Sequence, residues 1–371
     1  MHLTRRGLLS STMSALALSI IPLKGNSAPR RVLSNGVDIS WLPDVEAAGG
    51  RFYTSTGQRI DAIKLLKVSG VKVGRIRVFV NPQTPNGNLE RALTLAKRLK
   101  KEKMEICIDL HFSDVWADPG NQQTPIGWPT EIAELEKTVA AYTQSTLQRF
   151  VDADLAPKWV QIGNEIGGGF LWPLGSLWDG TASQWENFVR LHNSATRVLR
   201  RVTPTAKSVI HLEWGGDAER VRYWLTSARA YGLNKYDLIG LSYYSQWSGS
   251  LANLEKVLSI VTTEFKTPVM IAETAYPWTS QRFGNDVIDI STSKLPGISF
   301  STAGQEQYVQ TLKDLLLRQP ANRGLGMWWW EGLATVVRSQ NGEILWNGGM
   351  ANSALIKTNG RALPALKAFN T

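Results

Sequence analysis

The stretch that decides the fold prediction is Trp159-Val-Gln-Ile-Gly-Asn-Glu-Ile-Gly-Gly-Gly-Phe-Leu-Trp-Pro173. It opens with an apolar run of strand character, Trp159 to Ile162, and turns polar at Asn164-Glu165. Three glycines then break the chain before an aromatic segment. A carboxylate placed where a buried strand ends and a loop begins is typical of an α/β barrel. That interpretation requires strand and helix units to alternate along the rest of the chain.

Eight segments have strand character and alternate with segments of helical spacing. Several are nearly continuous apolar runs, as expected for parallel strands buried on both faces. The predicted strands are Gly36–Leu42, Val73–Val80, Glu105–Phe112, Lys158–Glu165, Ser208–Trp214, Leu238–Tyr244, Pro268–Ala275 and Gly324–Glu331. The predicted helices are Ile60–Lys67, Leu89–Lys101, Ile132–Val151, Ser183–Arg201, Ala218–Tyr231, Leu251–Phe265 and Gln305–Arg318, with a short one after Pro364.

The alternation predicts the α/β class and a single-domain (β/α)8 TIM barrel. The alternative is an open doubly wound sheet, but its Gly-x-Gly-x-x-Gly nucleotide signature is absent from the first strand–helix link, Glu46-Ala-Ala-Gly-Gly50. Long connections follow the third, fourth and seventh strands, at 113–131, 166–182 and 276–301. Loops of this length tend to be functional, and all three would open on the same face of the barrel.

The N-terminus reads as an export signal rather than as part of the fold. Arg5-Arg6 precede an apolar run from Leu8 to Leu23, and small residues follow up to Ala28. Residues 1–28 are therefore predicted to be a signal peptide, similar to the twin-arginine type, and residues 29–371 the folded domain. The protein would then be periplasmic or secreted. An uncleaved membrane anchor is the alternative.

The composition and charge of the chain limit the kinds of partner that it is expected to bind. The 371 residues are 43% hydrophobic with a mean hydropathy of −0.17, as in soluble globular proteins. Loss of residues 1–27 would lower the net charge from +10 to +7, because three basic residues and no acid lie there. The densest basic clusters, 97–103 and 197–201, lie in predicted helices, which favours solvated helix faces over a nucleic-acid footprint. The single Cys107 excludes an internal disulfide.

Two glutamates lie at the ends of predicted strands: Glu165 ends the fourth strand and Glu273 ends the seventh. Across the mouth of a barrel such a pair can act as proton donor and nucleophile on a glycosidic bond, with retention when the carboxyls are about 5–5.5 Å apart. Glu165 would need apolar surroundings to keep its proton, which Trp116 and Trp172 could provide.

Glu273 would need to stay ionised, and we expect Arg77 and the Tyr243 hydroxyl to favour this. Asn164 could bond the sugar 2-hydroxyl. Several of the 15 tryptophans fall in loops or strand ends, where flat aromatic surfaces suit pyranose rings. The predicted substrate-binding residues are Asn164, Arg77, His111, Asp114, Trp116, Trp172, His211, Tyr243, Trp247 and Trp330.

A metal site is a competing interpretation of His111, Asp114 and Asp118, which fall within eight residues. The sequence contains no His-Glu-x-x-His pattern of zinc hydrolases beside them. Loop anchoring and sugar hydrogen bonds are favoured, so no metal and no required cofactor are predicted.

The chain resembles the arabinogalactan endo-β-1,4-galactanases, glycoside hydrolase family 53. The resemblance runs from about residue 35 to the C-terminus, and its most specific element is Asp109-Leu-His-Phe-Ser-Asp-Val-Trp-Ala-Asp-Pro119. Further matching segments are Gly36-Val-Asp-Ile-Ser-Trp41, Arg75-Ile-Arg-Val-Phe-Val-Asn-Pro82, Val160-Gln-Ile-Gly-Asn-Glu165, Leu171-Trp-Pro173, Gly240-Leu-Ser-Tyr-Tyr244, Glu273-Thr-Ala-Tyr-Pro277 and Asn359-Gly-Arg-Ala-Leu-Pro364.

The resemblance implies a retaining endo-hydrolase of β-1,4-galactan or arabinogalactan in pectin side chains, with Glu165 as proton donor and Glu273 as nucleophile. It implies a polysaccharide partner, and we expect a monomer that binds no nucleic acid and, once the signal is removed, no membrane. Some relatives hold a structural calcium after strand seven, where Asp286 and Asp289 lie here without a clear ligand spacing.

The sequence departs from the family pattern near the expected cleft. Ser245-Gln-Trp-Ser248 replaces Pro-x-Trp-His, Met350-Ala-Asn352 replaces Trp-Asp-Asn, and Trp328-Trp-Trp330 replaces a pattern with phenylalanine and tyrosine. The preferred linkage therefore stays open, with an endo-β-mannanase or endo-β-glucanase as alternatives. A sugar-binding protein without turnover is disfavoured because both glutamates are present.

Overall fold

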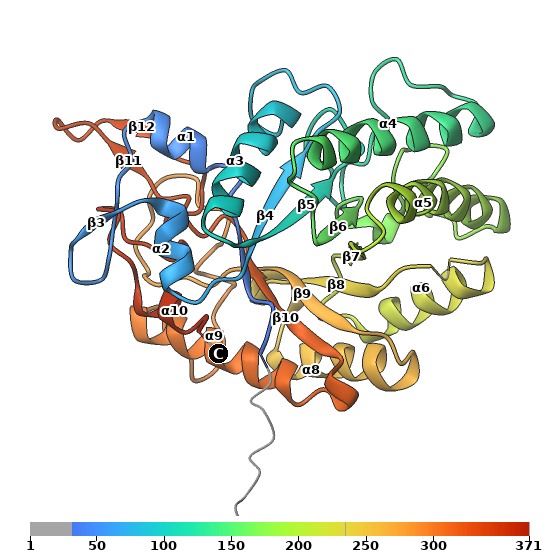
Figure 1. The fold of residues 1–371 in the computed structure, drawn as a ribbon. Coiled ribbons are helices and arrows are strands. Elements are labelled where there is room, and N and C mark those ends of the chain that lie inside the picture. The colour runs from blue at the N-terminus through green and yellow to red at the C-terminus, as the bar shows by residue number, and fades with distance from the viewer. Residues whose placement is uncertain (1–31, 234, 371) are drawn as a thin grey trace, which may run out of the picture. The chain divides into compact units, whose positions relative to one another are not determined.

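The computed structural model describes residues 32–233 and 235–370. The predicted export signal, residues 1–28, lies outside them. Within the described residues, eight parallel strands close into a barrel in the order β1-β10-β9-β8-β7-β6-β5-β4, and β4 returns to β1 (Figure 1). These strands are β1 (Gly36–Asp38), β4 (Val73–Val78), β5 (Glu105–Leu110), β6 (Trp159–Ile162), β7 (Lys207–Leu212), β8 (Leu238–Tyr243), β9 (Val269–Thr274) and β10 (Gly324–Trp329). The (β/α)8 prediction is confirmed.

Helices surround the barrel at the predicted places (Figure 1). Six of them begin at a residue whose side chain accepts a hydrogen bond from a backbone N–H of the first turn: Asp61, Asn88, Thr181, Asp217, Ser250 and Ser301. The helices are α2 (Ala62–Val68), α3 (Leu89–Lys101), α4 (Ile132–Asp152), α5 (Ala182–Val202), α6 (Ala218–Ala230), α8 (Leu251–Ser259) with its π-helical continuation η2 (Ile260–Glu264), α9 (Thr302–Leu317) and α10 (Pro364–Lys367).

Several shorter elements were not predicted, because two to six residues are too few to show a period. Most belong to the connections of the barrel. They are α1 (Leu42–Ala47), α7 (Ser245–Ser248), the 3-10 turns η1 (Ile166–Gly168) and η3 (Pro320–Asn322), the hairpin β2 (Phe52–Tyr53) with β3 (Arg59–Ile60), and the hairpin β11 (Val337–Arg338) with β12 (Ile344–Trp346).

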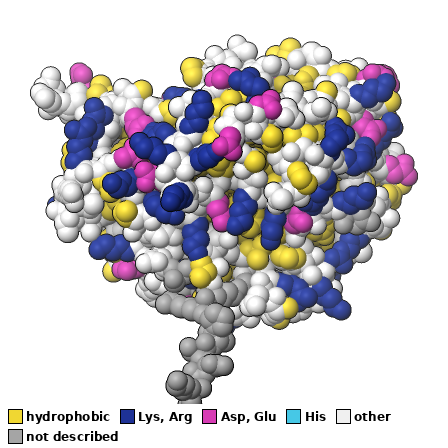
Figure 2. All heavy atoms as spheres, in the orientation of Figure 1, with side chains coloured by type: hydrophobic (Ala, Val, Ile, Leu, Met, Phe, Trp, Pro, Cys, Tyr) yellow, Lys and Arg dark blue, Asp and Glu magenta, His cyan; other side chains and the backbone are white. Residues whose placement is uncertain are grey.

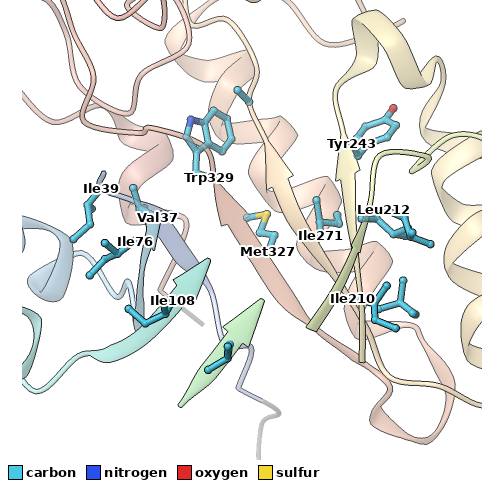
Figure 3. Close-up of a cluster of buried hydrophobic side chains, with 14 of the residues drawn as sticks. Val37, Ile39, Ile76, Ile108, Ile210, Leu212, Tyr243, Ile271, Met327 and Trp329 are labelled. Atoms are coloured by element: carbon cyan, nitrogen blue, oxygen red, sulfur yellow. The ribbon is translucent and has the colours of Figure 1, made fainter. Parts of the chain in front are cut away.

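Strand alternation separates two layers of side chains. One set packs outward under the helices, and Figure 3 shows part of it, including Ile76, Ile108 and Ile210. The alternate positions form a second buried apolar cluster, the floor of the barrel interior, made of Val73, Cys107, Trp159, Val209, Leu238, Met270, Ala272 and Trp328. Two residues further along their strands, the next inward positions carry Arg75, Asp109, Gln161 and His211, all buried. The barrel therefore carries a polar layer above an apolar floor.

A β-bulge in β9 decides where Glu273 points. Leu241 pairs with Ile271, but the next residue, Ser242, pairs with Glu273, so Ala272 is the extra residue. Because Ala272 belongs to the inward floor, strict alternation would turn Glu273 outward. The bulge instead lets Glu273 face the interior.

The surface is basic but mixed. Figure 2 shows Lys and Arg side chains spread over one face with Asp and Glu among them. Within the two basic clusters, Arg98 pairs with Glu46 and Asp61, and Arg197 pairs with Glu136. Such pairs are typical of a solvated helix face. No helix of the described part of the chain is long and apolar enough to span a membrane.

Candidate active site

A cleft of about 1350 Å³ lies where the barrel strands reach their carboxyl ends. The residues that line it follow or end at least seven of the eight strands, as in the functional face of this fold. They include Trp41 after β1, Trp116 after β5, Glu165 after β6, Glu213 after β7, Tyr244 after β8, Glu273 within β9 and Trp330 after β10.

Glu165 enters the cleft through a strained backbone. Its φ of 49° and ψ of 54° are left-handed, which costs a non-glycine residue about 1–3 kcal/mol. The buried Gln122 holds this conformation, because its Nε2 donates to the carbonyl oxygens of Asn164 at 2.7 Å and of Glu165 at 3.2 Å.

The glycines after Glu165 are required by close approach. A Cβ on Gly167 would lie 2.5 Å from Oε1 of Glu213 and 2.6 Å from the Trp214 ring. Gly169 has a φ of 86°, and a Cβ there would lie 2.0 Å from the carbonyl oxygen of Gly175. The glycine run therefore allows the β6 loop to fold tightly beside the carboxyl of Glu165.

The carboxyl of Glu165 is built to hold a proton. Its Oε1 lies 2.5 Å from Oγ of Ser242. Burial raises the pKa of Glu165 well above its usual value, and the nearby negative charges of Glu273 and Glu213 raise it further. This is the state that a general acid requires near neutral pH.

Glu273, unlike Glu165, is paired with a positively charged side chain. Nη1 of Arg75 lies 2.7 Å from its Oε1, and the Tyr244 hydroxyl donates to its Oε2 at 3.0 Å. Burial leaves the pKa of Glu273 above its usual value and the charges of Asp109 and Asp38 add to the rise, but the Arg75 charge and the Tyr244 hydrogen bond oppose it. Two carboxyls with pKa values pushed apart by their environments are typical of an acid and a nucleophile.

Arg75 is the centre of the polar layer. Its guanidinium is buried and pairs with Asp38 at 2.9 Å and Asp109 at 2.8 Å, in addition to Glu273. It also donates to Oε1 of Gln161 and Oδ1 of Asn164. A buried cation with this many acceptors fixes the orientation of every group that it contacts.

Six of the twelve predicted site residues line the cleft: Asn164, Glu165, Trp116, Trp247, Glu273 and Trp330. Trp116 and Trp330 stand in an aromatic group with Trp41, whose ring lies 5.7 Å from Trp116 and 5.9 Å from Trp330. Asn164 is only 5% exposed and is already bonded, since its Nδ2 donates to the Ala117 carbonyl at 2.8 Å.

The prediction that Arg77 and Tyr243 keep Glu273 ionised is wrong. Arg77 lies two residues further along β4 than Arg75, above the polar layer, and pairs with Glu331 at 3.3 Å. Its guanidinium stacks 3.8 Å from the Trp116 ring centroid. Tyr243 points outward by strand alternation, as Figure 3 shows, and its hydroxyl donates to the Gly249 carbonyl at 2.8 Å. The adjacent Tyr244 takes the expected role.

The other four predicted residues do not line the cleft. His111 is buried between Asp109 and the Ala117 N–H. Asp114 accepts hydrogen bonds from the N–H groups of Asn81 and Ile126 and so anchors its loop.

Trp172 donates to the Gly168 carbonyl and packs on Trp178, which reaches the cleft in its place. His211 is fully buried beneath Ser242, its Nε2 2.8 Å from Oγ. These two residues lie next to cleft-lining residues and do not line the cleft themselves.

The family model described as glycosyl hydrolase family 53 matches residues 34–369, nearly the whole described chain. The chain belongs to glycosyl hydrolase family 53. It is 32% identical over 342 residues to an arabinogalactan endo-β-1,4-galactanase of Humicola insolens, an alignment that covers 90% of this chain and 98% of the relative.

Solved structures of family 53 agree with this assignment. The chain is 30% identical to the family 53 catalytic domain of Ignisphaera aggregans, with a TM-score of 0.81 over 91% of this chain and 95% of that one. It is 31% identical to one of two fungal β-1,4-galactanases, with a TM-score of 0.80 over 92% and 99%. The predicted family and the predicted enzyme class, a glycoside hydrolase, are confirmed.

Sequence reasoning missed several residues that build this family 53 site. Arg75 has the same inward parity on its strand as Arg77, so the strand pattern alone could have proposed it. Gln122 and Ser242 carried no pattern of their own, since a lone polar residue in a loop or a strand has many roles. Further cleft-lining residues that were absent from the predicted binding set are Trp41, Asp118, Trp178, Glu213, Trp214 and Tyr244.

The described residues contain no group of three or more His, Cys, Asp or Glu side chains placed to hold a metal ion. Asp289 accepts from Arg282 at 2.7 Å and from Ser291 at 2.8 Å, while Asp286 accepts from the Phe283 N–H at 2.7 Å. Protein donors thus contact both carboxylates, although Oδ1 of Asp286 is buried without a hydrogen-bond partner among the described residues.

Proposed function

We propose that this protein is a retaining endo-β-1,4-galactanase in which Glu165 is the proton donor and Glu273 the nucleophile. The observation that carries the proposal is the contrast between the two carboxyls of one cleft. Glu165 is partly buried beside two negative charges, while Glu273 is ion-paired to Arg75. A neutral acid and an ionised carboxylate are the two groups that a retaining glycosidase needs.

In the first step, protonated Glu165 donates its proton to the glycosidic oxygen while Glu273 attacks the anomeric carbon. The leaving chain departs and a covalent glycosyl ester forms on Glu273. In the second step, Glu165, now ionised, takes a proton from a water molecule that attacks the same carbon and releases Glu273. Two inversions give overall retention.

Arg75 and Tyr244 serve the nucleophile in this scheme. Both contact the carboxylate of Glu273, so they keep it ionised and aimed before the attack. As the ester forms, the negative charge on Glu273 falls and these two bonds weaken. If they stabilised the free carboxylate too strongly, they would therefore slow its attack. Trp116 and Trp330 offer flat surfaces to the sugar that reacts.

Cleavage inside a chain fits the exposed aromatic residues along the cleft. Trp178 is 62% exposed and Trp247 is 63% exposed, and both line the cleft with the two carboxyls. Large aromatic side chains left open to solvent in a cleft mark a binding surface. Sugar units on either side of the scissile bond would rest on them.

The galactan substrate is supported by relatives named as arabinogalactan endo-β-1,4-galactanases and by the fungal β-1,4-galactanase structure. The alternatives are β-mannan and β-glucan, because the sequence departs from the family pattern near the cleft. The barrel is also shared with a family 113 β-1,4-mannanase at 11% identity and a TM-score of 0.50. That likeness concerns the fold alone.

The substrate test is reducing-sugar release from linear β-1,4-galactan, β-1,4-mannan and β-1,4-glucan by the purified enzyme. We expect galactan to be cut into oligosaccharides and the other two to be left intact. Activity confined to the mannan or the glucan would contradict the proposal.

We also propose that the protein is exported through residues 1–28 and acts as a periplasmic or secreted monomer. The order of basic, apolar and small residues at the N-terminus supports export. N-terminal sequencing of protein from the periplasm or medium should start within a few residues of Ala28. Full-length protein held in the membrane would favour the anchor instead.

A further inference from the structure

We propose that Ser242, oriented by neutral His211, accepts a hydrogen bond from protonated Glu165 and thereby holds the proton on Oε1 of the acid. This deepens the proposed function and rests on it, since it concerns the same proton donor. Ser242 and His211 would be positioning residues, because they act through Glu165.

Three side chains from successive strands form a continuous chain of contacts. Oε1 of Glu165, after β6, lies 2.5 Å from Oγ of Ser242 on β8. That Oγ lies 2.8 Å from Nε2 of His211 on β7, and Nδ1 of the same ring lies 2.9 Å from Oδ1 of Asn164. The Ser242 hydroxyl has one proton to donate and two possible acceptors.

His211 carries one proton. It is fully buried, and burial together with the Arg75 charge lowers the pKa of His211 well below its usual value. A neutral imidazole has a hydrogen on one ring nitrogen only, and the neighbours decide which one.

Those neighbours place the proton on Nδ1. The Asn164 amide is fixed, because Nδ2 donates to the Ala117 carbonyl while Oδ1 accepts from Arg75 at 2.9 Å. Oδ1 can only accept, so an unprotonated Nδ1 at 2.9 Å would set two lone pairs against each other.

Nδ1 of His211 also lies 3.0 Å from Nε2 of Gln161. That amide is fixed too, since its Oε1 accepts from Arg75 and its Nε2 donates to Asp109 at 2.7 Å. The second Nε2 hydrogen has Asn164 Oδ1 at 3.1 Å as an acceptor, so Gln161 does not need Nδ1 as one.

The direction of the remaining bonds follows. With the proton on Nδ1, Nε2 of His211 can only accept, and the Ser242 hydroxyl donates to it. Oγ of Ser242 has then used its one hydrogen. With an ionised Glu165 the 2.5 Å contact would need Ser242 as its donor, so with Ser242 donating to His211 we infer the reverse direction, with Oγ as the acceptor. Glu165 must supply the hydrogen, which it does only in its neutral form.

An ionised Glu165 disrupts this chain. Ser242 can turn its hydrogen toward the carboxylate, but Nε2 of His211 then loses its donor in a buried site. A buried acceptor without a partner is unfavourable, so the chain favours return of the proton to Glu165 after each transfer. This matches the alternation between acid and base in the proposed reaction.

Other ionisable groups also act on the two ends of the chain. Those that face Glu165 are Glu273 from β9, Glu213 after β7, Asp118 after β5 and Tyr244 after β8. Those that act on His211 are Arg75, Asp109 and His111. A test must leave these groups in place and change only the hydroxyl or the ring.

The direct test is the titration of Glu165 in the full chain by ¹³C NMR of carboxyl-labelled glutamate, with Glu165→Gln to assign the signal. Ser242→Ala removes the acceptor, and Ser242→Thr keeps a hydroxyl as the matched control. We expect Ser242→Ala to lower the Glu165 midpoint by about one pH unit, and Ser242→Thr to stay near the wild type. The alkaline limb of kcat/KM on galactan should move by the same amount.

His211→Leu is the second variant. It removes the acceptor of the Ser242 hydroxyl, which is then free to donate to the carboxylate, so the Glu165 midpoint should fall here as well. An unchanged or raised midpoint in Ser242→Ala would overturn the proposal, since a rise would mean that Ser242 donates to ionised Glu165. The titration needs no turnover, so a wild-type enzyme inactive on galactan would contradict the proposed function separately.

Discussion

The Arg75 guanidinium lies 2.7 Å from the carboxylate of Glu273 and, on its other sides, within 3 Å of Asp38 and Asp109. One buried cation thus pairs with the proposed nucleophile and with two structural carboxylates. Burial alone would lower the pKa of the Arg75 guanidinium, but these three negative charges outweigh that effect and hold the pKa well above its usual value. Arg75 therefore links the stability of the barrel to the ionisation of its nucleophile.

Replacing Arg75 by methionine should change both the stability of the barrel and the ionisation of Glu273. Without the cation the pKa of Glu273 rises, so the acid limb of the kcat/KM profile should move to higher pH. Loss of the partner of buried Asp38 and Asp109 should cost about 3–5 kcal/mol of unfolding free energy, measured by urea denaturation. A stable variant with an unchanged acid limb would contradict the role given to Arg75.

Two adjacent tyrosines provide a matched comparison. Tyr244→Phe removes the hydroxyl that donates to Glu273, and we expect kcat to fall roughly tenfold to a hundredfold, as for a hydrogen bond to a charged group. Tyr243→Phe removes a bond to the Gly249 carbonyl outside the barrel interior and should lower stability by about 1 kcal/mol while kcat stays near the wild type. Equal losses of kcat in the two variants would argue against the assignment.

Glu213 should tune the proton donor. Burial raises the pKa of Glu213 to about 7, and its negative charge raises the pKa of Glu165. Glu213→Gln removes that charge, so the alkaline limb of kcat/KM should move to lower pH. The exposed Glu255→Gln is a control that should leave the limb in place.

Glu213→Gln should also change how the stability of the protein depends on pH. Between pH 4.5 and 7 the folded protein binds the Glu213 proton more tightly than the unfolded chain does, so its stability falls as the pH rises through this window. Relative to the wild type, Glu213→Gln should therefore raise Tm more at pH 8 than at pH 4. Thermal melts at the two pH values measure this, and a Tm gain that is the same at both would rule out the linkage.

Gln122 should matter for catalysis although it touches no reacting atom. Its amide holds the left-handed backbone of Glu165 from the carbonyl side. Gln122→Ala should relax that strain and lower kcat roughly tenfold, about 1.4 kcal/mol. The neighbouring exposed Gln123→Ala is the control, and steady-state kinetics with no difference between the two variants would show that the clamp is unnecessary.

The fold was predictable from sequence because its signal is repeated. Eight strand and helix segments lie where periodicity placed them, and helices such as α3 begin and end at the predicted residues. The position of the two glutamates in the cleft was also predictable, since each lies at the end of a predicted strand with a buried, apolar pattern. Short elements such as α1 and β11 carried too few residues to show any period.

The contacts of the site were harder to predict. Strand alternation separates Tyr243 from Tyr244, but the strand had to be placed to within one residue to choose between them. The bulge at Ala272, which turns Glu273 inward, has no sequence signal of its own. The prediction for Trp172 was wrong because its indole donates to the Gly168 carbonyl of its own loop, and the neighbouring Trp178 lines the cleft instead.

The central claim is that Glu273 is the nucleophile of a retaining reaction, and chemical rescue tests it most directly. Glu273→Ala is mixed with azide and an activated aryl β-galactoside chain, and the anomeric configuration of the product is read by ¹H NMR. The account predicts loss of hydrolysis without azide and an α-glycosyl azide with it, because azide enters the space left by the carboxylate. Near-normal hydrolysis by the variant, or a β-glycosyl azide, would contradict it.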